Sequence, residues 1–219
     1  MTWNDINVFQ FQQIIKIKDE EDTIERDSKL IAIINNWTEM QVDSLPVLEF
    51  NKERSKLKFL HDEIEGNPVK FININGRRYK CIYDIRKINA ARYIEGKTFS
   101  QDLIPNLHKI AASLVHPMKR TIFGWRLTKY DAAKHEDYSQ DMLEANFVNV
   151  YHSVVFFYHV YRNWMEVSKG YLIAEMKKKG VTNPEKVVAD LLNIMDGSIV
   201  PKLLPTTKIS QLAKHMNYQ

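Results

Sequence analysis

Hydrophobic residues recur every three to four positions along most of the chain, a spacing that places them on one face of a helix. The first predicted helix follows Thr2, which has Asp5 three positions on, as in a capping box. A second helix is predicted after Asp27 or Ser28. A third is predicted at 47–64, directly after Pro46, because proline is tolerated in a helix's first turn. Further helices are predicted at 85–95, closed by Gly96, and at 101–117, 136–178 with a break near 146–149, 184–196 and 208–216.

One segment instead alternates hydrophobic and polar positions with a period of two, which is typical of a strand. Residues 69–84 read VKFININGRRYKCIYD, and Asn75-Gly76 supplies the positive φ angles that a two-residue hairpin turn needs. Residues 118–130 have no helical period, and the sequence is compatible with either a loop or a second hairpin around Gly124. The sequence thus predicts a mainly α protein, a multi-helix bundle with one small β-hairpin near residues 69–83 (α+β minor).

The chain of 219 residues is 44% hydrophobic, which is enough for a core without disulfides, and Cys81 is its single cysteine. Formal net charge is only +4 but is unevenly distributed. Residues 1–65 carry 8 basic and 14 acidic residues, residues 66–134 carry 14 and 4, and residues 135–219 carry 9 and 9. We therefore expect an acidic helical region at 1–65, a hairpin with a helical core at 66–180 and a helical extension at 181–219, or one domain that combines them.

The sequence contains none of the common catalytic motifs, phosphate-binding loops or metal-ligand spacings. His152 and His159 lie about two helical turns apart, but without a carboxylate beside them they are interpreted as core histidines. Cys81 is interpreted as a small buried residue. We expect no enzyme activity, no catalytic residue, no cofactor and no metal. The start of the chain does not resemble a signal peptide, and no stretch is apolar enough to predict a membrane span.

The basic middle of the chain is the candidate interaction site. Its residues can contact an acidic protein surface or, as a less favoured alternative, nucleic acid, because tyrosines are interleaved with basic residues in segment 70–97. The candidate interaction residues are Arg77, Arg78, Lys80, Arg86, Lys87 and Arg92.

Three segments resemble structural or assembly proteins of tailed bacteriophages, especially crAss-like phages and their relatives. Residues 70–99 are similar to an INGxxY hairpin followed by a Tyr-containing helix, residues 106–117 to a Leu-His-Lys helix that ends in proline, and residues 149–164 to an aromatic helix with paired phenylalanines. The preceding segment 44–52 also fits. After Pro117, however, a basic segment replaces the shorter polar loop of the family.

This resemblance implies a non-enzymatic virion structural protein, a ring or internal component that binds other phage structural proteins as a homo- or hetero-oligomer. The implied location is the virion, and the host cell cytoplasm during assembly. A transient tail assembly chaperone is the alternative, and a nucleic-acid-binding module is the second alternative. No membrane partner is expected.

Overall fold

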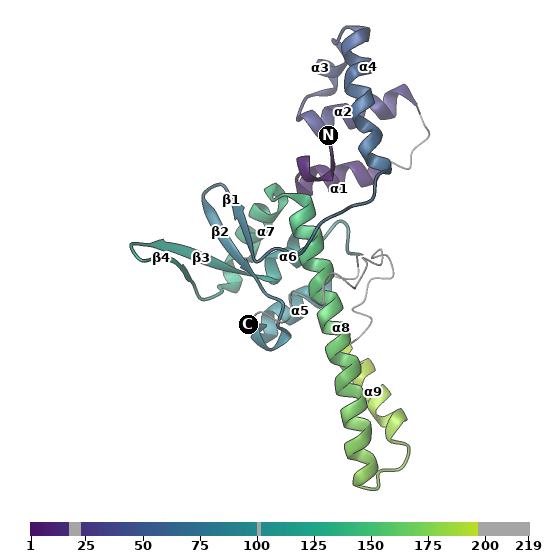
Figure 1. Ribbon diagram of the computed structural model, residues 1–219, viewed down its shortest axis with the longest axis vertical. Coiled ribbons are helices and arrows are strands. Elements are labelled where there is room, and N and C mark those ends of the chain that lie inside the picture. Colours follow the sequence, from purple (N-terminus) through teal and green to yellow (C-terminus); the bar gives the residue numbers. More distant parts are fainter. Residues whose placement is uncertain (18–22, 100–101, 197–219) are drawn as a thin grey trace.

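The computed structural model describes residues 1–17, 23–99 and 102–196, and the predicted mainly α class with a minor β component is confirmed (Figure 1). The helices are α1 (Val8–Ile17), α2 (Ile24–Asn35), α3 (Glu39–Asp43), α4 (Val47–Lys56), α5 (Ala90–Phe99), α6 (Leu107–Ser113), α7 (His135–Glu144), α8 (Phe147–Lys178) and α9 (Pro184–Asp196). The strands are β1 (Phe71–Ile74), β2 (Arg77–Cys81), β3 (Val115–Thr121) and β4 (Gly124–Leu127).

The four strands form one antiparallel sheet in the order β1-β2-β3-β4. Figure 1 shows α1–α4 at one end of the molecule, the sheet projecting from the middle, and α8 running on with α9 as an arm at the other end. A buried hydrophobic core runs from the N-terminal turn through the sheet to the first half of α8. It includes residues of both the predicted 1–65 and 66–180 regions, whose division stays a prediction.

The N-terminal helices begin at different caps from those predicted. Thr23, not Asp27 or Ser28, caps α2, and its side chain accepts a hydrogen bond from the Arg26 backbone N–H. Asp27 lies buried inside the helix, where one carboxylate oxygen is 2.5 Å from Nε of Arg54. The Thr2 capping box is present but precedes a short 3-10 turn. Sequence spacing could not reveal the tertiary partner that makes Asp27 an interior residue.

The predicted helix 47–64 is α-helical only to Lys56, and residues 57–61 form a 3-10 helix. Leu57 and Phe59 are both buried although they lie two positions apart. Residues two apart do not share a face of an α-helix, so the tighter winding lets both side chains reach the core.

The predicted hairpin is confirmed, with positive φ angles at Asn75 and Gly76. The predicted helix over 101–117 is wrong at both ends, because α6 starts at Leu107 and stops at Ser113, and residues 115–121 form β3. The second edge of β2 pairs with β3, with Tyr79 opposite Pro117. The open segment 118–130 contains a second hairpin, so the sheet is twice as wide as the single predicted hairpin.

The helix predicted to start after Asp84 and close at Gly96 is also different. Residues 85–87 form a 3-10 turn, α5 starts at Ala90, and the helix continues through Gly96 to Phe99. Asn89 acts as the local cap, since its side chain accepts a hydrogen bond from the Arg92 backbone N–H at 3.1 Å. The first turn of α5 is therefore set by Asn89.

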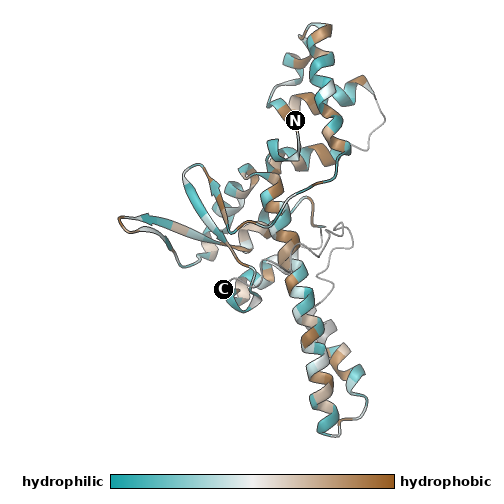
Figure 2. Ribbon diagram, viewed as in Figure 1, coloured by the Kyte–Doolittle hydropathy of each residue, from teal (hydrophilic) through white to brown (hydrophobic). Residues whose placement is uncertain are grey.

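The break between α7 and α8 is confirmed at residues 145–146, where Asn146 caps α8 by accepting a hydrogen bond from the Asn149 backbone N–H. Figure 2 shows hydrophobic residues gathered in the first half of α8 and alternating with hydrophilic ones along the arm. Gly180, with φ +71°, follows the end of α8, and α9 begins at Pro184 as predicted. The helix predicted at 208–216 lies outside the described residues.

Candidate functional site

The strand register sorts the sheet residues onto two faces, because side chains directly opposite in antiparallel strands point the same way and successive ones alternate. The inner face is buried by α7 and α8 and carries Ile72, Ile74, Tyr79, Cys81 and Val115. The outer sheet face is defined by the register positions that alternate with these, and consists of Phe71, Asn73, Arg78, Lys80, His116, Met118, Arg120, Trp125 and Leu127.

The outer sheet face is basic and partly apolar. None of the four strands contains an acidic residue, and the face presents Arg78, Lys80 and Arg120 beside Met118 and the aromatic rings. Its residues are half-buried or exposed. With no carboxylate in the strands to neutralise these cations, the surface favours a ligand or partner with negative charge.

Arg78 sits at the centre of this face between two aromatic side chains. Its guanidinium carbon lies 4.0 Å from the ring centroid of Phe71 and 5.8 Å from that of Trp125, which fits cation–π contacts. Its Nε is buried without a hydrogen-bond partner. The guanidinium is thus held in place by the rings while the side chain stays half-exposed.

The hairpin of β3 and β4 extends the face away from the body of the molecule (Figure 1). Ile122 and Phe123 at its turn are 93% and 80% exposed, and Leu127 on the outer face is 52% exposed. Isolated exposed hydrophobic residues are normal, but a group of them beside basic residues at a protruding turn is typical of a contact surface.

The inner face fixes the sheet to the helices. The Arg77 guanidinium donates to Asp141 of α7 at 2.8 Å, and the Tyr79 hydroxyl donates to the same carboxylate. This ion pair raises the pKa of Arg77, and burial raises that of Tyr79. The side-chain amide of Asn75, in the hairpin turn, also donates to the Glu144 carboxylate. Arg77, a candidate interaction residue, therefore contacts a helix of its own chain.

A second anchor connects β2 to α8. The Tyr83 hydroxyl lies 2.5 Å from the Val69 carbonyl oxygen and 2.9 Å from Oγ of Ser153, and its ring packs edge-on against Phe156. Cys81 lies in the same cluster, and burial raises the pKa of its thiol to about 11. Such a thiol stays protonated at neutral pH, which argues against a nucleophile and for the predicted packing role.

The remaining candidate residues lie off the outer face. Arg86 and Lys87, in the 3-10 turn after β2, are exposed and form ion pairs with Asp84. Arg92 is only 2% exposed, so its expected place on an interaction surface is corrected: it is an interior residue. Its guanidinium lies over the ring of Tyr130 at 3.8 Å and donates to the Val115 carbonyl oxygen.

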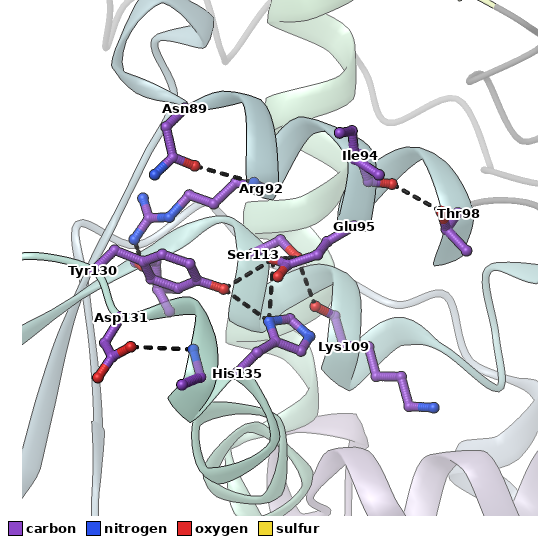
Figure 3. A network of polar contacts seen from close by, with 12 residues as sticks. Asn89, Arg92, Ile94, Glu95, Thr98, Lys109, Ser113, Tyr130, Asp131 and His135 are labelled. Atoms are coloured by element: carbon purple, nitrogen blue, oxygen red, sulfur yellow. Dashed lines mark hydrogen bonds and ion pairs between the residues drawn. The ribbon is translucent and has the colours of Figure 1, made fainter.

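Arg92 belongs to a polar network among α5, α6 and α7 (Figure 3). The Tyr130 hydroxyl donates to the Glu95 carboxylate at 2.9 Å and lies 2.9 Å from Nδ1 of His135. The Ser113 hydroxyl lies 3.4 Å from the same carboxylate. Burial lowers the pKa of His135 and of Arg92. Because Tyr130 closely follows β4, this network fixes the base of the projecting hairpin to the helices.

The candidate interaction residues chosen from the sequence do not include the part of the outer face that β3 and β4 provide, namely Met118, Arg120, Trp125 and Leu127. The available signal was the alternation of these residues with Lys119 and Arg126 on either side of Gly124. Within residues 1–17, 23–99 and 102–196, no cluster of three or more potential ligands could hold a metal ion, and no helix has the length and hydropathy needed to span a bilayer.

Comparison with protein-family models found no matching family, and comparisons with curated proteins and with solved structures found no match either. The resemblance to tailed-phage proteins therefore stays a prediction from the sequence segments described above.

Proposed function

We propose that this chain is a non-enzymatic structural protein of a tailed-phage particle that acts by binding other proteins through its outer sheet face. The observation that carries the proposal is a solvent-facing sheet surface with three cations, exposed apolar side chains and no acidic residue in any of its strands. The sequence resemblance supplies the phage context. A partner surface that is acidic and apolar fits this face best.

A protein partner is favoured over nucleic acid by the state of the aromatic rings. Phe71 and Trp125 already flank Arg78 of their own chain, whereas single-strand binding uses ring faces that are free for bases to stack upon. The exposed aliphatic residues Ile122 and Leu127 also favour a hydrophobic contact over a phosphate backbone.

Quantitative mass spectrometry of nuclease-treated particles from the phage that encodes the chain tests the proposal. A fixed copy number per particle is expected. A chain abundant in the infected-cell lysate but missing from particles would identify a transient assembly chaperone instead. Detection in neither preparation under conditions that yield infectious particles would overturn both assignments.

Two double variants test whether incorporation into particles depends on the outer sheet face. Arg120→Glu with Leu127→Asp should lower incorporation into particles, because it adds negative charge to the face at exposed positions. Arg162→Glu with Val167→Asp makes the same formal charge change at exposed positions of the arm and should incorporate normally. Equal incorporation of both double variants would show that the outer sheet face is not the contact.

A further inference from the structure

A second exposed surface complements the outer sheet face in both charge and hydrophobicity. The α3–α4 tip, defined as residues 39–49, contains Glu39, Asp43 and Glu49, and the wider segment 36–51 has no lysine or arginine. All three acidic residues are exposed. Around them Met40, Val47 and Leu48 are 81%, 75% and 84% exposed.

Local structure explains why these hydrophobic residues face solvent. Val42 is the residue of α3 that faces the core, and it is 1% exposed. Pro46 ends the connection between α3 and α4 and lies immediately before α4. Val47 and Leu48 therefore occupy the first turn of α4, outside the hydrophobic core. The tip therefore presents three apolar side chains that nothing within the described residues covers.

The two surfaces match in composition. The outer sheet face has three cations, Arg78, Lys80 and Arg120, beside the apolar side chains of β3 and β4, while the tip has three carboxylates beside three apolar side chains. Opposite charges bordering hydrophobic contacts give an interface both its attraction and its register.

The two surfaces cannot meet within one chain. Figure 1, viewed down the shortest axis of the molecule, places the α3–α4 tip at the far end of the N-terminal helices and the sheet beside the first part of α8. The N-terminal helices are fixed to the body, since Trp3 and Phe11 pack against Phe147 at the start of α8. The tip of one molecule is therefore available to the sheet of another.

We infer that the chain associates with itself head to tail, the α3–α4 tip of one copy binding the outer sheet face of the next. The inference rests on the proposed function and names the partner of the same surface. Two different patches in contact form a heterologous interface, which repeats to give a closed ring or a filament. Both products suit a structural component.

Two full-length variants test this geometry by sedimentation. The tip variant carries Met40→Asp and Leu48→Asp, and the face variant carries Arg120→Glu and Leu127→Asp; all four positions are exposed, so folding should be retained, as circular dichroism would verify. We expect the wild-type chain to associate as its concentration is raised to about 100 μM. Its association constant should fall about tenfold between about 0.05 M and about 0.5 M salt.

Each variant alone should remain monomeric, because every chain in the sample lacks the same surface. An equimolar mixture should form one-to-one dimers and nothing larger, since the intact tip of the face variant can bind the intact face of the tip variant. The double variant Val167→Asp with Tyr171→Asp places the same chemistry on the exposed arm and should associate like the wild type.

A wild-type chain that stays monomeric, or a mixture that forms no dimer, would overturn the inference. If the face variant still failed to enter particles, the proposed function would stand with a different partner. Binding of a labelled oligothymidine by the monomeric wild type, lost in the face variant, would assign the face to nucleic acid and would overturn the protein partner as well.

Discussion

Gly66 lies where the segment between the N-terminal helices and β1 crosses α8, and replacing it with alanine tests this crossing. A Cβ atom at Gly66 would lie 2.5 Å from Cγ1 of Val148 and 2.6 Å from Cδ2 of His152. Ordinary carbon contacts begin at about 3.5 Å, so the methyl group would overlap both side chains by about 1 Å. The backbone φ at Gly66 is not in the left-handed region, so the cost is steric alone.

Neither neighbour can move freely. Val148 and His152 are 2% and 3% exposed, and a β-branched side chain in a helix is restricted to one main rotamer. Overpacking of this kind costs about 1–3 kcal/mol. We therefore expect Gly66→Ala to lower the free energy of unfolding by about 1–3 kcal/mol in urea titrations followed by circular dichroism, with an unchanged m-value.

Gly170→Ala is the matched control, because a Cβ there meets nothing within 4 Å and the residue lies inside α8. It should raise stability by up to about 1 kcal/mol, as alanine restricts the unfolded chain and favours the helix. A Gly66→Ala variant as stable as the wild type, beside a stabilised control, would show that the crossing is not closely packed.

Three further predictions concern other contacts of the fold. Tyr83→Phe removes the hydroxyl that bonds to a main-chain carbonyl, so stability should fall by about 1 kcal/mol in thermal melts; no change would mean that water replaces the bond. Arg78→Glu should destabilise the fold more than Lys119→Glu at an exposed position of β3, because Arg78 is packed between two rings; equal losses would contradict this packing. Burial lowers the pKa of His108 from 6.5 to about 4, so the folded state binds its proton less readily than the unfolded state. Stability should be fully present above pH 6.5 and fall towards pH 4, as protonated Nδ1 no longer accepts from Gln12, and His108→Gln should reduce this slope in urea titrations across that pH range.

The sequence by itself determined the features that depend on neighbouring residues. Asn75-Gly76 fixed the first hairpin because few other pairs adopt two successive positive φ angles. Gly180 and Pro184 marked the end of α8 and the start of α9 for similarly local reasons. The long apolar pattern of α8 also required no partner to be recognised, since a period near 3.6 over many turns favours only a helix.

Tertiary structure alone decided where residues met partners distant in sequence. Segment 115–121 became a strand because the free edge of β2 offered backbone hydrogen bonds that a final helical turn ending at Pro117 could not match. Arg92 is buried because the ring of Tyr130 and the Val115 carbonyl group compensate its charge. Arg77 forms an ion pair with Asp141 of α7. Charge counts identified the basic region, but the strand register decided which cations share the outer sheet face.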